Sequence, residues 1–404
     1  MKSLYLDADL SRILLTKALS VFWKNAPLSG FSPVCYAEMA EPGLPGPNWV
    51  KIKNKMCGIC ATDVHLMFLE MSPKASFVAV PPVGRVFFGH EVVGEVTETG
   101  AGVRDLSYAD RVVLRYHMPN CYNRELYPKC PMCRNGDYLL CANVVPGGGL
   151  PDNRGGGFSP VMVAHESQAV KIDDDISDSE AVMIEPYACA VRAVLKQIPH
   201  DGDKVLVIGA GTIGLCIIAS LCAISPRADI YAISRYPHQA TMAERLGAKE
   251  VIPEKDAYRK VARVTEGRYI REMFNNENVI GGFDIVYDSV GSDKTVKDAL
   301  RWTRGGGTVV LVGANFAPEH LDYSPIIFQE VRLIGSNSHG MEEDFRGKRA
   351  GTFETVLALH KEGKIDLSGF VTHTFPVDDY REAIGVFFNK KNDKSIKVAL
   401  VHSQ

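Results

Sequence analysis

The second half of the chain alternates between short apolar runs and longer segments with helical periodicity. The run Lys204–Ile208 (KVLVI) has the pattern of a strand buried on both faces, and a helical segment follows over about 211–223. Further strands are predicted at 230–233, 283–287, 308–312 and 331–335, with helices at 239–246 and 295–302. Strands and helices in alternation predict a doubly wound α/β domain, in which helices cover both faces of a parallel sheet.

The first half differs in its pattern. Short alternating runs at 49–53, 92–96 and 111–115, separated by Gly- and Pro-rich segments, predict a β-rich domain. Helical periodicity returns over 179–197, and the pattern is mixed again from about 340 to a strand-like run at 397–401. We expect the β-rich domain over 1–186, including a cysteine loop at about 121–141, the α/β domain over 187–338, and a return to the first domain over 339–404.

Composition and charge narrow the classes of protein. The chain has 404 residues, 46% hydrophobic and 23% charged, with a formal net charge of −3. These values exclude a disordered chain and a coiled-coil rod, and they give no basis for nucleic-acid or membrane-surface binding. No apolar run reaches the roughly 20 residues that cross a bilayer, and Asp7 and Asp9 interrupt the place of a secretory signal. We therefore expect a cytoplasmic protein.

The cysteines cluster in a way that favours metal binding. Six of the ten lie between Cys57 and Cys141, and two pairs have C-x-x-C spacing. In a protein of a reducing compartment this indicates metal ligands rather than disulfides. Four of them suit a closed, structural zinc site: Cys121, Cys130, Cys133 and Cys141. Cys121 is the least secure, since eight residues separate it from Cys130.

A second group of potential ligands precedes the α/β domain. It consists of Cys60, His90, Glu91 and Glu185. Thiolate, imidazole and carboxylate are all good zinc ligands, and a catalytic zinc keeps one position open for water or substrate. Cys57 and Cys189 lie near this group; we expect Cys57 to pack in the core, and Cys189 is a weaker competitor for the ligand role of Glu185.

A glycine-rich loop after the first buried strand predicts a dinucleotide site. Its residues are Gly209, Ala210, Gly211, Thr212, Ile213 and Gly214. Strand, loop and helix come in the order of a G-x-G-x-x-G motif, whose glycines allow a tight turn, close approach of a pyrophosphate and close helix packing. The helix N-terminus then favours the phosphates. Gly313, after a later strand, is a candidate neighbour of the nicotinamide.

The end of the next strand bears on the choice of cofactor. An enzyme specific for NAD usually has an acidic residue there for the ribose 2′-hydroxyl. This chain has Ser234 and Arg235 instead, whose hydroxyl and guanidinium suit a 2′-phosphate. NADP is therefore favoured, and NAD remains the alternative if Arg235 is only a solvated charge.

Together these motifs resemble the zinc-dependent alcohol dehydrogenases of the medium-chain dehydrogenase/reductase superfamily. The resemblance runs from about residue 34 to the C-terminus, over G-I-C-x-T-D-x-H, G-H-E-x-x-G, the cysteine loop, E-P and G-x-G-x-x-G. It implies a GroES-like catalytic domain interrupted by a Rossmann domain, with the active site between them, and a homodimer or homotetramer. Glu185-Pro186 resembles the polyol, sugar and threonine dehydrogenase branch.

The resemblance also implies roles for single residues. Cys60, His90 and Glu185 match the catalytic zinc ligands, with Glu91 as a further ligand or a carboxylate that exchanges with one. Asp63 matches the residue that orients the ligand histidine, and Thr62 and His65 match a proton relay. One departure concerns the cysteine loop, where Tyr127 occupies the expected first position, so that Cys121 replaces it or the site is incomplete. Residues 1–33 match the family poorly.

The function predicted from these parts is hydride transfer between NAD(P) and a secondary alcohol, polyol, sugar or amino-alcohol. Zinc would activate the substrate oxygen, and Thr62 and His65 would carry its proton. The alternative is a zinc-binding member of the fold that has lost redox activity, which the complete set of motif residues disfavours. A zinc-ribbon nucleic-acid binder is disfavoured by the balanced charges of the cysteine loop, and a zinc-free quinone reductase by Cys60 and Glu185.

Overall fold

The computed structural model describes residues 1–404 except 73–83, 117, 145–149, 319 and 403–404. The chain forms two compact units, one from Met1–Glu185 with Leu367–Gln404 and the other from Pro186–Asp366. The second unit therefore extends past the expected end at 338. Arg192 provides a physical reason, because its guanidinium donates to the carbonyls of Asn337 and His339 and ties the following segment to the second unit.

The first unit is built around a seven-stranded sheet. The strand order is β19-β20-β3-β5-β6-β8, and β7 pairs with β3. The strands are β3 (Trp49–Gly58), β5 (Glu91–Thr99), β6 (Arg111–Leu114), β7 (Val161–His165), β8 (Ala169–Lys171), β19 (Val371–Pro376) and β20 (Lys397–Val401). Antiparallel pairing of β3 with β20 joins the C-terminal return to the N-terminal part, as the mixed pattern after residue 340 led us to expect.

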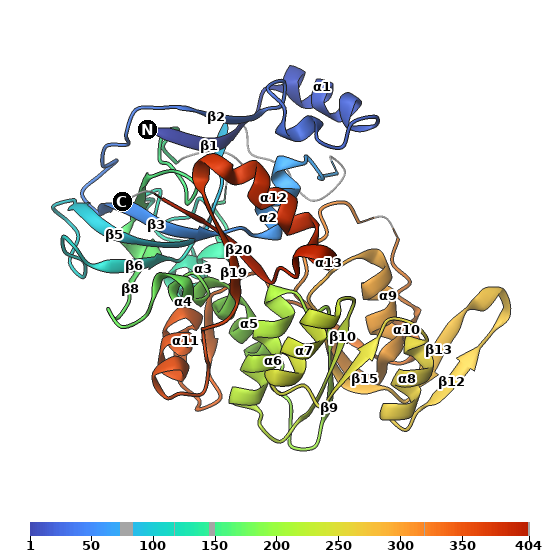
Figure 1. The fold of residues 1–404 in the computed structure, drawn as a ribbon. Coiled ribbons are helices and arrows are strands. Elements are labelled where there is room, and N and C mark those ends of the chain that lie inside the picture. Colours follow the sequence, from blue (N-terminus) through green and yellow to red (C-terminus); the bar gives the residue numbers. More distant parts are fainter. Residues whose placement is uncertain (73–83, 117, 145–149, 319, 403–404) are drawn as a thin grey trace. The chain divides into compact units, whose positions relative to one another are not determined.

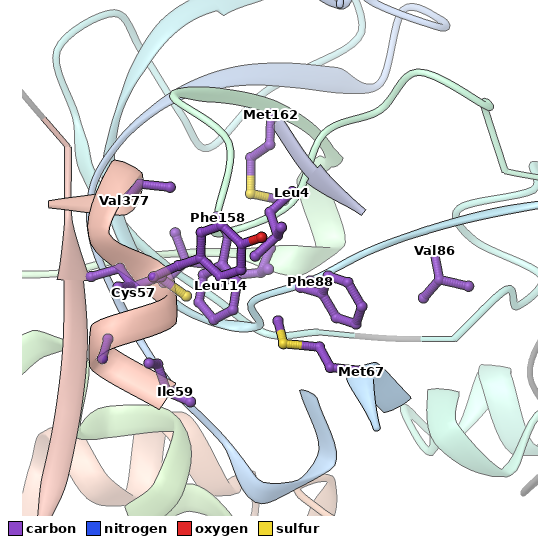
Figure 2. Close-up of a cluster of buried hydrophobic side chains, with 14 of the residues drawn as sticks. Leu4, Cys57, Ile59, Met67, Val86, Phe88, Leu114, Phe158, Met162 and Val377 are labelled. Carbon is purple, nitrogen blue, oxygen red and sulfur yellow. The ribbon is translucent and has the colours of Figure 1, made fainter. Parts of the chain in front are cut away.

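A large hydrophobic core lies in this unit. Leu4, Cys57, Phe88, Phe158 and Val377, from segments far apart in the chain, meet in it (Figure 2). Cys57 is completely buried, and burial raises the pKa of its thiol. It therefore packs as an apolar residue, as predicted. The short helices of the unit are α2 (Ala61–Met67), α3 (Pro131–Arg134), α4 (Asp178–Ala181), α12 (Tyr380–Phe388) and α13 (Lys390–Asp393).

The first 33 residues, for which the sequence suggested no structure, add a second small sheet. Strand β1 (Lys2–Asp7) lies between β2 (Val34–Glu38) and β4 (Arg85–Phe87) in an antiparallel arrangement. Helix α1 (Leu10–Ser20) follows, capped by the Asp9 carboxylate, which accepts the Ser11 and Arg12 amides. The extension thus joins the core of the first unit (Figure 1).

The second unit is the predicted doubly wound domain. Its six-stranded parallel sheet has the order β11-β10-β9-β14-β15-β16. The strands are β9 (Lys204–Ile208), β10 (Asp229–Ser234), β11 (Glu250–Pro253), β14 (Phe283–Asp288), β15 (Thr303–Leu311) and β16 (Arg332–Gly335). The helices are α6 (Thr212–Ile224), α7 (Pro237–Arg245), α8 (Ala257–Val264), α9 (Asp293–Trp302), α10 (Ser324–Phe328) and α11 (Thr352–Lys361). The α/β fold class predicted from the alternating pattern is confirmed.

Three smaller features complete the description. Helix α5 (Ile184–Lys196) carries the chain from the first unit into the second. Two hairpins belong to the second unit, β12 (Arg268–Arg271) with β13 (Glu277–Ile280) and β17 (Met341–Glu343) with β18 (Arg349–Gly351). No helix in the described part of the chain is long and apolar enough to span a membrane.

Candidate metal centres and cofactor loop

The four-cysteine loop, Cys121 with Cys130, Cys133 and Cys141, brings all its sulfurs together. The four atoms lie within 4.8 Å of one another, and all four side chains are buried. The Sγ atoms of Cys121 and Cys141 are 3.7 Å apart, and those of Cys130 and Cys141 are 3.9 Å apart. Sulfurs at the corners of a tetrahedron around zinc would be about 3.8 Å apart, given Zn–S bonds of about 2.3 Å. The residues therefore fit a closed zinc site.

Backbone amides around the loop stabilise thiolates. The amide of Cys133 donates to Cys130 Sγ at 3.4 Å, and the amide of Asn143 donates to Cys141 Sγ at 3.3 Å. Burial raises the pKa of Cys130, but the amides of Cys133 and Ala142 outweigh it and bring the pKa to about 6. Burial raises the pKa of Cys133 and of Cys141. Zinc binds the deprotonated thiolate, so Cys130 is the cysteine of the loop whose surroundings favour metal binding before the metal arrives.

The position of Cys121 answers the question raised by Tyr127. The side chain of Tyr127 is 81% exposed, whereas Cys121 is fully buried beside the other three cysteines. The side chain of Asn120 accepts the Tyr122 amide, and that of Asn123 accepts the Asn120 amide. These side-chain turns fold the longer loop back, so that Cys121 supplies the fourth sulfur.

Cys60 and His90 form the centre of the second candidate site. Cys60 is the N-cap residue of α2, and His90 lies in the turn between β4 and β5. Asp63, which is buried, connects the two segments: its carboxylate accepts the Gly89 amide at 3.0 Å and the Cys60 amide at 3.3 Å. Asp63 Oδ1 is also 3.4 Å from His90 Nδ1. This contact fixes the imidazole and leaves Nε2 as the atom that would bind a metal.

The charges of the neighbouring residues change the pKa of His90. Burial lowers the pKa of His90, but the charges of Asp63 and Cys60 outweigh it, and the pKa lies well above its usual value. A thiolate and an imidazole in contact, with a carboxylate behind the imidazole, are the donor set of a zinc site. The Cys60–His90 pair therefore fits zinc in its chemistry.

Glu91 has a partner that the sequence analysis missed. Lys397 Nζ lies 2.7 Å from Glu91 Oε1 and donates also to the carbonyl of Ile59 at 3.3 Å. Both side chains of the ion pair are buried. Burial lowers the pKa of Lys397, but Glu91 outweighs it and the net pKa is raised. Glu91 is thus held by an ammonium group. The one feature of the sequence that could have indicated this partner is the lysine at the start of the apolar run KVALV.

Glu185 is the predicted ligand that comes from helix α5. It is buried in the first turn of α5, and its charge contributes to the raised pKa of Lys397. Among the described residues, the four-cysteine loop is the one group of three or more His, Cys, Asp or Glu whose ligand atoms lie within 4.8 Å of one another. The structure therefore brings Cys60 to His90, and among the described residues neither Glu91 nor Glu185 completes a group of that compactness with the pair.

The two predicted relay residues share helix α2 with Cys60. Thr62 is in its first turn, and His65 is in its last. The sequence analysis missed Glu70, whose Oε2 is 2.6 Å from His65 Nδ1. Leu69, with φ of 56°, turns the chain after the helix and brings Glu70 back to the histidine. Both groups reach solvent, so a proton on His65 has a nearby carboxylate acceptor.

The glycine-rich loop has the geometry of a phosphate-binding turn. Gly209 has φ of +89°, and a Cβ atom on Gly214 would lie 1.7 Å from the Gly209 carbonyl oxygen, so both positions require glycine. A Cβ on Gly211 would meet nothing within 4 Å, which leaves space for a ligand. Thr212 and Ile213 begin α6, whose N-terminal amides and dipole favour an anion. The loop therefore fits a dinucleotide.

Residues at the end of β10 have partners of their own. The Ser234 hydroxyl donates to the Tyr236 carbonyl at 3.1 Å, and Arg235 Nε lies 3.3 Å from Glu254 Oε1. Glu254, missed in the sequence analysis, follows β11. Gly313 donates its amide to the Asp288 carbonyl at 2.9 Å and closes the turn after β15. A 2′-phosphate would compete with Glu254 for Arg235.

Comparison with known proteins agrees with the fold and with these motifs. Residues 46–174 match the alcohol dehydrogenase GroES-like domain, and residues 212–376 match the zinc-binding dehydrogenase family. The chain is 30% identical to L-idonate 5-dehydrogenase of Vitis vinifera over 84% of each chain. It is also 30% identical to L-threonine 3-dehydrogenase of Rhizobium etli, over 83% of this chain and 87% of the relative.

A solved structure of similar fold contains a cofactor. It is a protein from Sinorhizobium meliloti, described as a zinc-binding dehydrogenase and bound to NADP. Its TM-score is 0.69 at 25% identity, over 91% of this chain and 96% of that one. The chain belongs to the zinc-dependent alcohol dehydrogenases of the medium-chain dehydrogenase/reductase superfamily, and it is an NAD(P)-dependent alcohol oxidoreductase.

Proposed function

We propose that the chain oxidises a secondary alcohol, polyol, sugar or amino-alcohol, or reduces the matching carbonyl. The observation that carries the proposal is the Cys60–His90 pair, set by Asp63, with Thr62 and His65 on the same helix as Cys60. Relatives of this chain act on substrates of this kind, since they are named for L-idonate and L-threonine.

Zinc held by Cys60 and His90, with Glu185 as the third ligand, would supply a Lewis acid that lowers the pKa of the substrate hydroxyl. Thr62 accepts the hydroxyl proton and His65 receives it from Thr62, with Glu70 holding the imidazole in place. Asp63 keeps His90 oriented, and Lys397 neutralises the buried Glu91 next to the site. The four-cysteine loop would hold a second, structural zinc.

Metal content and turnover test this proposal together. Wild-type protein should contain about two zinc ions per chain. Cys60→Ser should reduce turnover at least about a thousandfold, which is about 4 kcal/mol of transition-state stabilisation. The variant should keep the zinc of the four-cysteine loop and its affinity for cofactor. Cys57→Ala, a neighbouring cysteine that only packs, is the matched control. Retained activity in Cys60→Ser would refute the assignment.

For the cofactor we propose NADP, on the basis of Ser234 and Arg235. Arg235→Ala should raise the Kd of NADP about tenfold or more and leave that of NAD within about twofold, because a charge-assisted contact to phosphate is lost. Glu254→Gln should change NADP binding in the opposite direction, since it releases Arg235. Equal changes for both cofactors would show that Arg235 is only a solvated charge.

The assembly and location stay predictions. We propose a homodimer or homotetramer in the cytoplasm, with a small alcohol or carbonyl compound as the binding partner. Light scattering on the purified chain decides between the two oligomers, and a monomer would contradict both.

A further inference from the structure

A small cavity lies in the first unit, and Gly89, the residue before His90, belongs to its lining. Gly89 and Tyr116 form one side of it, and Arg154 with Phe87 forms another. Its volume is about 30 Å³. The ring centroids of Tyr116 and His90 are 5.7 Å apart, and Gly89 directly precedes His90 in the chain. Tyr116 and Gly89 therefore connect the lining of the cavity to the imidazole that would bind the catalytic metal.

Arg154 contributes a guanidinium whose hydrogen-bonding capacity is largely unused. Among the described residues it donates one hydrogen bond, from Nη1 to the Pro151 carbonyl at 3.4 Å, although arginine has five N–H donors. Its other neighbour is the Phe87 ring, with Cζ 5.8 Å from the centroid. No Asp or Glu oxygen in the described part of the chain lies within the 4.0 Å of an ion pair with it.

The surroundings of the Arg154 guanidinium favour the binding of an anion. Burial lowers the pKa of Arg154, and the interactions with Tyr116 and Asp152 compensate only in part. A guanidinium remains charged under these conditions, so it is a partly desolvated cation without a bonded counter-ion. Such a group binds a carboxylate strongly, because the geometry allows two parallel hydrogen bonds.

The backbone fixes the position of Arg154. Its carbonyl accepts the Val163 amide at 2.8 Å and so anchors the residue to β7. The next residue, Gly155, has φ of +71°, and a Cβ there would lie 2.4 Å from the Val161 carbonyl oxygen. The side chain therefore starts from a rigid point, which is the arrangement expected of a binding group.

We propose that Arg154 binds the carboxylate of the substrate, so that the preferred substrates are hydroxy acids rather than neutral polyols. The proposal rests on the proposed function and narrows its substrate class. A water needs about 10–15 Å³ of such space. The cavity therefore has room for two or three atoms of that size, which suits a carboxylate and is too small for a whole sugar. The carbinol carbon would lie outside it, towards His90, while the Tyr116 hydroxyl offers a second donor.

Pairs of substrates that differ only in the carboxylate test this inference. L-idonate and L-iditol form one pair, and L-threonine and L-threoninol form the other; each acid is compared with the alcohol in which the carboxylate is reduced. The zinc-loaded full chain should have a higher kcat/KM for the acids. Arg154→Gln should reduce kcat/KM for the acids about tenfold to hundredfold and leave the alcohols within about threefold.

Arg154→Lys, which keeps the charge and loses the planar fork, should give an intermediate value for the acids. Arg104→Gln, at an exposed position of the same unit, is the matched control and should change neither pair. Equal losses for acids and alcohols in Arg154→Gln, or a wild-type preference for the alcohols, would overturn the inference while leaving the proposed function intact.

A calorimetric measurement of binding, made without turnover, tests the role of Arg154 separately from the proposed function. L-idonate should bind the zinc-loaded chain, and Arg154→Gln should weaken that binding by the same tenfold to hundredfold. Absence of turnover with all four compounds and both cofactors would contradict the proposed function. Unchanged L-idonate binding in Arg154→Gln would contradict the role of Arg154 independently. Thermal unfolding of the variant checks that the fold is kept.

Discussion

The two groups of potential zinc ligands in the first unit differ in how they are assembled. The four-cysteine loop draws all its ligands from one segment of 21 residues, Cys121–Cys141, and its sulfurs already lie at tetrahedral spacing. The second group draws on a helix cap, a turn before a strand and the first turn of α5. The Cys60 and His90 side chains interact directly, but the described residues of this group do not form a set of three ligands as compact as the cysteine loop. A closed local loop can preorganise a structural metal, whereas a catalytic site keeps an open position and depends on distant segments.

Removal of a loop cysteine should have the largest effect on stability. Cys133→Ser takes one of four buried thiolates from the structural site, and we expect loss of one zinc and of more than about 4 kcal/mol of unfolding free energy. Metal analysis and chemical denaturation measure both. Cys216→Ser, buried in α6 of the other unit, should keep both zinc ions. Full zinc content in Cys133→Ser would contradict the ligand assignment.

The Lys397–Glu91 ion pair, near Cys60 and His90, should contribute nearly as much to the stability of the fold. Lys397→Met leaves the buried Glu91 carboxylate without its ammonium partner and should destabilise the chain by about 3–5 kcal/mol. The double variant Lys397→Met/Glu91→Gln should recover most of this loss, because no unpaired charge remains. Additive losses in the double variant would show that the two side chains act independently.

The direction of the Lys397 pKa shift determines how the stabilisation by the ion pair depends on pH. Although burial lowers the folded-state pKa of Lys397, the buried Glu91 carboxylate raises it above the usual value of a lysine. The stabilisation is therefore complete at neutral pH and is lost only as the pH rises through the raised pKa. The stability advantage of wild type over Lys397→Met should therefore be full at neutral pH and shrink only under alkaline conditions, which alkaline denaturation curves can measure.

The smallest expected effect concerns the relay. Glu70→Gln removes the carboxylate that holds His65, and kcat should fall about tenfold, less than the 10²–10⁴ of a direct acid–base group. KM and thermal stability should stay unchanged. Added imidazole buffer should restore part of kcat, because it provides another proton acceptor. Glu98→Gln, at a distant exposed position, is the control; a loss that buffer does not relieve would assign Glu70 a purely structural role.

Much of this molecule could be predicted from local sequence pattern. Strand β9 coincides with the predicted run Lys204–Ile208, because a continuous apolar run followed by glycines has few other structures. The loop Gly209–Gly214 was equally evident. Local pattern predicts what neighbouring residues determine among themselves, such as buried strands, tight turns and closely spaced cysteines.

The remaining features depend on contacts between distant segments. Lys397 pairs with Glu91 across strands far apart in the chain, and Arg154 reaches the small cavity of the first unit through the turn at Gly155. Glu254 meets Arg235 only because β10 and β11 are neighbours in the sheet. No periodicity or spacing in the sequence indicates such pairs. The sequence therefore identified Glu91 and Arg235 as candidates but did not reveal their partners Lys397 and Glu254.

Anomalous diffraction at the zinc edge, on crystals of the full chain grown with zinc, tests the account most directly. We predict two peaks per chain, one equidistant from the four sulfurs of the cysteine loop and one bound by Cys60 Sγ and a His90 ring nitrogen. A single peak, or a second peak away from Cys60 and His90, would contradict the central claim that this pair holds the catalytic metal.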